Sequence, residues 1–183
     1  MISANHAGQY PEIEDAACVH ATAVVIGNVR IGHGVFVGPQ AVIRSDEPDP
    51  EGHIEPIVIE PGANIQDGVI VHALGGSGVR IGKGASVAHG AVVHGPCDVG
   101  ESSFIGFQSV VFNATLGSGV VLLHLALVEG VRIPDNIHVP SMTAVRNEAD
   151  LERLSPVSSE LAAFAEKVRR MNRFLAEVSP LGQ

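Results

Sequence analysis

The sequence predicts a mainly β fold, a parallel β-helix of about six coils with a C-terminal α-helix packed alongside it. An apolar residue returns every six positions from Ile13 onward, a period that fits neither an amphipathic helix nor an alternating strand. Glycine supplies 21 of the 183 residues and aromatic residues only 4%, so the core is expected to consist of β-branched and small side chains. A six-residue period is typical of a solenoid whose coils have three short flat faces.

The repeat is expected to span residues 13–140, after a polar, extended lead-in. Ile43 and Ile59 are sixteen positions apart, so ten extra residues are expected to loop out within the acidic stretch 45–56. A second, Gly-rich insertion of four residues is expected near 75–78. The positions expected to point inward are Ile13, Val19, Val25, Ile31, Val37, Ile43, Ile59, Ile65, Val71, Ile81, Val87, Val93, Val99, Ile105, Val111, Leu116, Leu122 and Val128.

Residues 158–178 are predicted to form an amphipathic helix, after a crossing segment at 141–157. Ser158 and Ser159 offer an N-cap, and Pro180 ends the helix. Apolar residues recur at spacings of three and four, which predicts a stripe that packs along the side of the solenoid. The stripe consists of Leu161, Phe164, Val168, Met171, Leu175 and Val178. The whole chain, 1–183, is expected to be a single domain.

Composition excludes several classes of function. The formal charge of −9 argues against binding to nucleic acid or to an anionic membrane, which requires a basic surface. No basic segment precedes an apolar run at the N-terminus, so no signal peptide is expected, and no apolar stretch is long enough to span a bilayer. Two cysteines do not make a disulfide framework, so a cytoplasmic location is expected.

The register of the repeat places two histidines together. His72 directly follows the inward Val71, and His94 directly follows the inward Val93. Three hexapeptide steps separate these positions, which is one full coil. His72 and His94 are therefore expected on the same face of consecutive coils, about 4.8 Å apart along the axis and both pointing outward.

His89 occupies the preceding face, two residues after the inward Val87. Within one subunit it is expected to point away from the other two imidazoles. If all three bind one ion, the third must therefore come from a second copy. A heterologous contact can close into a ring of three, so the sequence predicts a homotrimer in which His72 and His94 of one chain meet His89 of the next.

Three neutral imidazoles with an open fourth position are typical of a catalytic zinc site. Such an ion lowers the pKa of bound water to about 7 and gives hydroxide at neutral pH. Carbon dioxide is the expected substrate, and its reversible hydration to bicarbonate is the expected reaction. Asp67, with Gln66 beside it, precedes His89 by one coil in the same column and could accept a hydrogen bond from an imidazole. Arg44 joins the column of His72 if the long loop takes up one hexapeptide step.

Other candidate residues receive structural interpretations. Cys97 falls where a small inward residue is due, so it is expected in the core and not as a nucleophile. Phe107 and Phe112 lie near the histidine columns and are expected to pack the subunit contact. The acids of the long loop, Asp46 and Glu47 among them, are more often a solvated charge run than proton shuttles. The remaining histidines are interpreted as surface or turn residues: His6, His20, His33, His53, His124 and His138.

Four segments resemble the γ-class carbonic anhydrases, and the similarity covers nearly the whole chain. They read Arg-Ser-Asp-Glu at 44–47, Asn-Ile-Gln-Asp-Gly-Val-Ile-Val-His-Ala-Leu at 64–74, Ala-His-Gly-Ala-Val-Val-His-Gly-Pro at 88–96 and Phe-Ile-Gly-Phe at 104–107. The resemblance implies a left-handed parallel β-helix and a homotrimer. It also implies a zinc ion, with iron or cobalt as alternatives, at each subunit contact, ligated by His72, His89 and His94.

The resemblance also implies roles for residues around the ion. Arg44 and Asp67 are expected to form a salt bridge between subunits, Gln66 to lie beside the metal-bound water, and Asn172 to line the site from the helix. The best-studied members carry a long acidic loop with a glutamate proton shuttle where this chain has Gly75 in a short turn. Glu47 matches a second family glutamate, so proton export could run through Glu47 or through other groups of the long loop, Glu51 or His53.

Two other classes of function remain open. Hexapeptide solenoids include acyl-coenzyme A transferases, and relatives include thioester hydrolases. The chain could also be a metal-stabilised structural or scaffold subunit with little activity. An acyltransferase would not need three ligating histidines across a contact, and a scaffold would bind metal without hydrating carbon dioxide.

Overall fold

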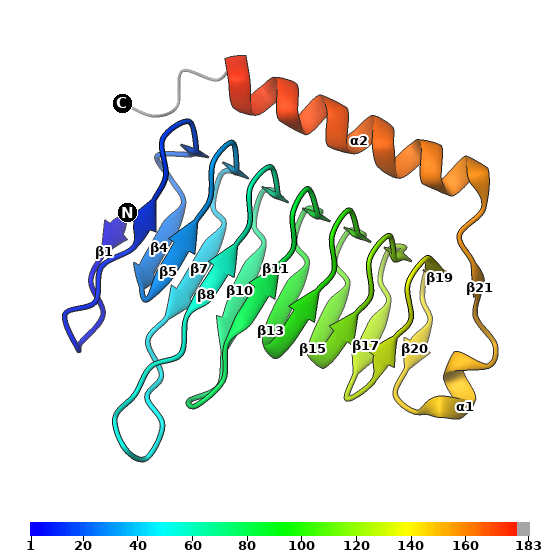
Figure 1. Cartoon of the computed structure of the whole chain (residues 1–183), viewed down its shortest axis with the longest axis horizontal. Coiled ribbons are helices and arrows are strands. Elements are labelled where there is room, and N and C mark those ends of the chain that lie inside the picture. The colour runs from blue at the N-terminus through cyan, green and yellow to red at the C-terminus, as the bar shows by residue number, and fades with distance from the viewer. Residues whose placement is uncertain (179–183) are drawn as a thin grey trace.

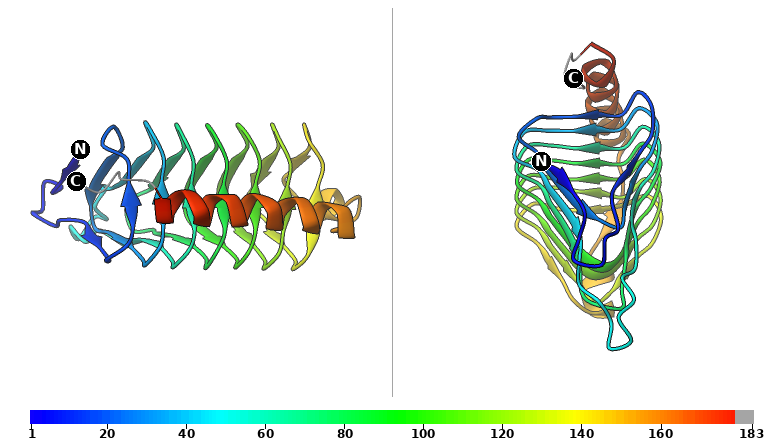
Figure 2. Two further views of the ribbon diagram at one scale, coloured as in Figure 1. Left: turned by 90° about the horizontal axis from the view of Figure 1, so that it is seen from above. Right: turned by 90° about the vertical axis from the view of Figure 1, so that its left-hand side faces the viewer.

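The computed structural model describes residues 1–178 and shows a triangular parallel β-helix with a long helix lying along one side (Figures 1 and 2). The solenoid has about seven turns, one more than predicted. The additional coil has Ile133, Val139 and Val145 as its inward residues, all completely buried. None of the helices in residues 1–178 is both long and apolar enough to cross a membrane.

Two of the three faces belong to one continuous thirteen-stranded sheet. We call the first of these the histidine face, because it carries His72 and His94. The strands are short, and β13 and β15 each turn a corner and serve both faces. The histidine face contains β1 (Ile2–Ser3), β4 (Val24–Gly27), β7 (Val42–Ser45), β10 (Ile70–Ala73), β13 (Val92–Val99), β15 (Val110–Leu116), β17 (Leu127–Glu129) and β20 (Ala144–Val145). The second face adds β2 (Glu12–Ile13), β5 (Val29–Ile31), β8 (Ile57–Ile59), β11 (Val79–Ile81) and β18 (Arg132–Ile133).

The third face, which we call the helix face, is a separate eight-stranded sheet. Helix α2 (Ser159–Val178) packs over β6, β9 and β16 of this sheet and runs back along the solenoid (Figure 2). The connection passes through α1 (Glu148–Leu151) and the antiparallel strand β21 (Ser155–Pro156). The other strands are β3 (Cys18–Val19), β6 (Phe36–Val37), β9 (Asn64–Ile65), β12 (Ser86–Val87), β14 (Phe104–Ile105), β16 (Val121–Leu122) and β19 (Ile137–Val139).

The predicted inward positions form the core. From Val25 to Val128 these residues are at most 1% exposed, and each pairs with its equivalent one coil away, as Val71 does with Ile43 and Val93. Cys97 is also in this core, as predicted, and burial raises the pKa of its thiol. The lead-in is more regular than predicted, because β1 pairs with β4.

The two insertions leave the solenoid at the same corner, between β7 and β8 and between β10 and β11 (Figure 1). They pack against each other through glycine. A Cβ at Gly75 would lie only 2.2 Å from the carbonyl oxygen of Pro48. The longer insertion is closed at its base by the Ser45 hydroxyl, which donates to the carbonyl of Glu55 at 2.7 Å. Both loops therefore stand next to the histidine face.

The predicted apolar stripe of the terminal helix is partly wrong. Leu161, Val168 and Leu175 are half-buried, but Met171 is 55% exposed. Phe164 and Val178 of the predicted stripe are also exposed. The two buried residues of α2 are Ala165 and Asn172. A small and a polar residue therefore mark the contact line, because the helix approaches the sheet closely above a polar cluster.

Candidate metal centre

His72 and His94 lie side by side on the histidine face. Strands β10 and β13 pair in parallel with His72 opposite His94, in the predicted register. The ring centroids are 5.0 Å apart, and His72 Nδ1 lies 3.1 Å from His94 Nε2. Two nitrogen atoms at about 2.0 to 2.1 Å from one tetrahedral zinc ion would be about 3.3 Å apart. The pair therefore has nearly the separation that two ligands of one ion require.

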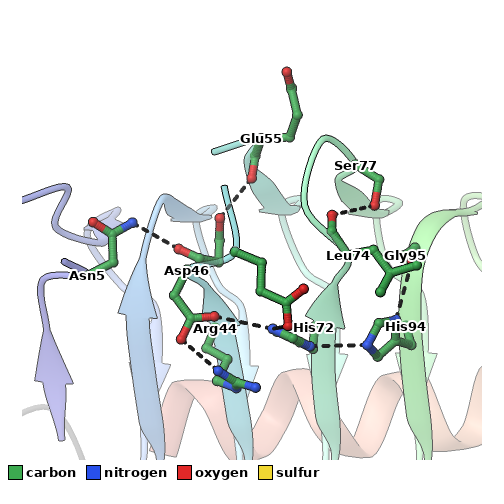
Figure 3. A network of polar contacts seen from close by, with 11 residues as sticks. Asn5, Arg44, Asp46, Glu55, His72, Leu74, Ser77, His94 and Gly95 are labelled. Atoms are coloured by element: carbon green, nitrogen blue, oxygen red, sulfur yellow. Dashed lines mark hydrogen bonds and ion pairs between the residues drawn. The ribbon is translucent and has the colours of Figure 1, made fainter. Parts of the chain in front are cut away.

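The other ring nitrogen of His72 faces two carboxylates of the long loop. His72 Nε2 is 3.2 Å from Asp46 Oδ1 and 3.5 Å from Glu47 Oε1. Arg44, in register one coil before His72, donates to Asp46 Oδ2 at 2.7 Å (Figure 3). Metal-ligating histidines usually donate their second ring N–H to a carboxylate or carbonyl, which fixes the tautomer and the ring orientation. The surroundings of His72 fit this pattern.

The electrostatic environment keeps His72 in the form that binds a metal. Burial is the largest effect and lowers its pKa below the ordinary value of 6.5, and the charge of Arg44 lowers the pKa further. Asp46 and Glu47 act in the opposite direction without reversing the shift. The imidazole is therefore neutral at neutral pH, as a metal ligand must be.

Asp46 corrects the sequence interpretation. Its carboxylate does not belong to a solvated charge run, because it contacts both His72 and Arg44 and is only 21% exposed. Its position two residues after Arg44 is the signal that could have identified it. The salt bridge implied between Arg44 and Asp67 does not form within the chain, since Asp67 lies beside His89. A bridge between these two residues across a subunit contact stays a prediction.

His89 lies on the corner after β12, away from the pair on the histidine face. Its Nδ1 is 3.7 Å from Asp67 Oδ2, which precedes it by one coil as predicted, and its side chain is 51% exposed. Its Nε2 is the nitrogen left to face a ligand. Within residues 1–178 no group of three His, Cys, Asp or Glu side chains is placed to hold a metal ion. A three-histidine site would therefore need a second copy of the chain.

Three side-chain amides meet between the helix face and α2, and we call them the amide cluster: Asn64, Gln66 and Asn172. Gln66 Nε2 donates to Asn64 Oδ1 at 2.7 Å and to Asn172 Oδ1 at 3.1 Å. The three residues are only 2%, 8% and 7% exposed. Among the described residues, Asn64 Nδ2 and Asn172 Nδ2 find no hydrogen-bond partner. Each such buried donor costs about 1–3 kcal/mol, so the amide cluster resembles a binding site more than a structural network.

The amide cluster and His89 line the same cavity, of about 190 Å³. Phe104, Phe107 and Phe164 supply much of its apolar lining. The structure thus brings together three residues with predicted site roles: His89 from the corner after β12, Gln66 from the segment after β9, and Asn172 from α2. Asn64 and Ser86 also line this cavity and were missed by the sequence interpretation. Their signal is a polar residue at an outward position of a strand that a helix covers.

Comparisons with known proteins agree with this architecture. Residues 10–45 match the family described as Bacterial transferase hexapeptide (six repeats). The carbonic anhydrase of Methanosarcina thermophila is 36% identical over 188 aligned residues, which cover 91% of this chain and 74% of that protein. The carboxysome assembly protein CcmM of Nostoc sp. is 37% identical over 174 aligned residues, covering 90% of this chain. A solved hexapeptide transferase family protein from Anaplasma phagocytophilum shares the fold, with a TM-score of 0.80 at 22% identity over 98% of both chains.

The relation to CcmM concerns only part of that protein, because this chain spans 30% of its length. The relation to the M. thermophila carbonic anhydrase extends over most of both chains. Identity of 36% across a shared repeat architecture places the two in one family. The chain therefore belongs to the hexapeptide-repeat family of the γ-class carbonic anhydrases and their relatives, which include CcmM.

Proposed function

We propose that this protein catalyses the reversible hydration of carbon dioxide to bicarbonate at metal sites shared between the subunits of a homotrimer. Each site would take His72 and His94 from one chain and His89 from the next. Zinc is the expected metal, with iron or cobalt as alternatives. The observation that carries the proposal is the 3.1 Å separation between His72 Nδ1 and His94 Nε2, which suits two ligands of one ion.

A trimer is proposed because one chain holds only part of a site. The pair lies toward the end of the histidine face, whereas His89 lies at the corner where the helix face meets the start of the histidine face. Contact between unlike surfaces of successive copies is heterologous and can close into a ring. Three copies would then form three equivalent sites. Each site would have three imidazoles as ligands, and imidazole is the commonest metal ligand in proteins.

A zinc ion held by His72, His94 and the His89 of the next chain would lower the pKa of bound water to about 7 and so would supply a nucleophile at neutral pH. The chain's own groups position the reactants around it. Asp46 holds the ring of His72 by a hydrogen bond, and Asp67 lies beside the ring of His89. Gln66 gives both of its amide hydrogens to Asn64 and Asn172. The Nδ2 groups of these two asparagines have no partner among the described residues and line the same cavity, so they are the donors that could hydrogen-bond an oxygen of the substrate.

Hydration releases a proton that must reach solvent, and Glu47 is the proposed carrier. Its Oε1 is 3.5 Å from His72 Nε2, and its side chain is 43% exposed. A carboxylate exposed to water and close to a ligand of the site can take up, through solvent, the proton that hydration releases and then pass it to bulk water. Asp46, which is bonded to Arg44, is held in place and is less suited to carry a proton.

A second candidate function is a structural subunit that binds metal but turns over little substrate. The similarity to CcmM, a carboxysome assembly protein, favours it. Acyl transfer or thioester hydrolysis would rest on the shared fold alone. Bound metal without hydration would select the structural subunit, and acetyl-coenzyme A turnover by metal-free protein would select acyl transfer.

The test is to purify the chain anaerobically, count the metal per chain by elemental analysis, and measure hydration by stopped flow. The expected result is about one metal per chain with activity in the wild type, and loss of both in His89→Ala. His33→Ala is the matched control, because His33 is an exposed histidine in a turn at another corner of the solenoid. Full metal content and activity in His89→Ala would refute the shared site.

A further inference from the structure

Side chains on successive coils form a column at the corner that follows the helix face. Asp67, His89, Phe107 and His124 occupy equivalent positions in this column, each two residues after an inward residue. Backbone bonds link them: Gly90 N–H donates to the Asp67 carbonyl, Gln108 N–H to that of His89, and Leu125 N–H to that of Phe107, at 2.9 to 3.0 Å. The solenoid therefore brings these four side chains into one file.

The rings in this column contact one another. The centroids of His89 and Phe107 are 5.4 Å apart with the planes tilted by 37°. Those of Phe107 and His124 are 4.4 Å apart, and the planes are nearly parallel at 13°. Rings that stack at such distances attract each other beyond the area they bury. His89 thus has a carboxylate on one side, from Asp67, and an aromatic ring on the other.

His124 is itself held firmly. The Phe107 backbone N–H donates to His124 Nδ1 at 3.0 Å, so this imidazole both stacks on the phenyl ring and bonds to the backbone that carries it. Gly106 leaves room for the arrangement, since a Cβ there would lie 2.8 Å from His124 Nδ1 and 2.6 Å from the carbonyl carbon of Leu123. A side chain with two independent attachments is a suitable support for its neighbour.

We propose that Phe107 and His124 are positioning residues that hold the His89 imidazole in the orientation needed for ligation across the subunit contact. The inference rests on the proposed function, because it assigns these residues to the third ligand of that site. His89 is half exposed, and within residues 1–178 the charged group beside its ring is the Asp67 carboxylate, at 3.7 Å. An unsupported ring would lose rotational freedom on binding an ion, and the stack removes that loss beforehand.

Four variants separate the contributions. Phe107→Leu removes the ring that contacts His89. His124→Phe keeps a ring to stack but removes the acceptor, whereas His124→Asn keeps an acceptor but removes the ring. Phe174→Leu is the control, since Phe174 is an exposed aromatic residue on α2. A thermal melt of each variant reports whether it folds.

The first measurement uses metal-free protein with labelled histidine and records the ring proton shifts of His89 by NMR. The ring current of Phe107 should displace these shifts in the wild type, and the displacement should vanish in Phe107→Leu and shrink in His124→Asn. The second titrates cobalt(II) alone and follows the visible spectrum. Phe107→Leu and His124→Asn should bind cobalt about three- to tenfold more weakly, whereas His124→Phe should weaken binding less and the control not at all.

The NMR and cobalt measurements distinguish a failure of the proposed function from a failure of the positioning role. If wild-type protein binds no cobalt, the proposed function fails, and the NMR shifts still decide whether the column holds His89. If the wild type binds cobalt and folded His124→Asn and Phe107→Leu show unchanged His89 shifts and unchanged cobalt affinity, the positioning role is overturned. Should Phe107→Leu not fold, His124→Asn alone decides, because His124 is only half-buried.

Discussion

Replacing Gly75 by alanine tests whether the two loops are packed as one unit beside the candidate metal centre. The new Cβ would lie 2.2 Å from the Pro48 carbonyl oxygen and 2.9 Å from its carbonyl carbon. Ordinary contacts begin near 3.5 Å, so the loops must separate by about 1 Å. Gly75 does not have a positive φ, so alanine brings no backbone strain of that kind. Overpacking of this sort costs about 1–3 kcal/mol.

The expected cost of ~2 kcal/mol corresponds to a fall of about 4–8 °C in melting temperature for a chain of this length. The measurement is thermal unfolding followed by circular dichroism, with Leu74→Ala as the control, because Leu74 is 46% exposed in the same loop. Metal affinity should fall as well, since Asp46 lies two residues before Pro48 and contacts His72. An unchanged melting temperature in Gly75→Ala would refute the packing of the loops.

Three further predictions concern the site. Below about pH 6.5 the metal-free chain should lose stability, because the pKa of His72 is lowered on folding and the unfolded chain takes up the proton first; urea midpoints at several pH values should show a slope that flattens in His72→Gln. Asp67→Asn should weaken metal binding by about 10- to 100-fold in a chelator titration, whereas Asp98→Asn, at a similarly exposed position on another face, should not. Asn172→Ala should keep its metal in elemental analysis but hydrate carbon dioxide more slowly, because the cavity loses the free Nδ2 donor of Asn172 and Gln66 loses one of the two acceptors that hold it; an unaltered rate would contradict the role of the amide cluster.

The six-residue period predicts most of what positions the site. Inward residues must repeat every coil, so a residue next to an inward position shares a column with its equivalents. This reasoning placed Arg44, His72 and His94 in register, and the pairing of the strands confirms it. The predicted number of coils is one too low, because Pro134 and Pro140 make the last repeat hard to recognise in the sequence. Its inward residues nevertheless keep the six-residue spacing.

Two features could not be read from the period. The position of Asp46 depends on the path of the long loop, which is set by tertiary contacts such as that between Ser45 and Glu55 and not by any repeat. The buried line of α2 depends on what lies beneath it. Asn172 is buried because it accepts a hydrogen bond from Gln66 of the helix face, and hydrophobic spacing cannot reveal such a polar contact.

The most direct test of the shared site is complementation between two inactive variants. His89→Ala keeps the pair on the histidine face, and His94→Ala keeps the third ligand. Each variant alone should bind little metal. After unfolding and refolding together in equal amounts, about one quarter of the contacts in a random ring of three should join an intact pair to an intact His89. Recovery of metal and hydration to about that fraction is the predicted result. No recovery in verified mixed assemblies, or full metal in either variant alone, would contradict it.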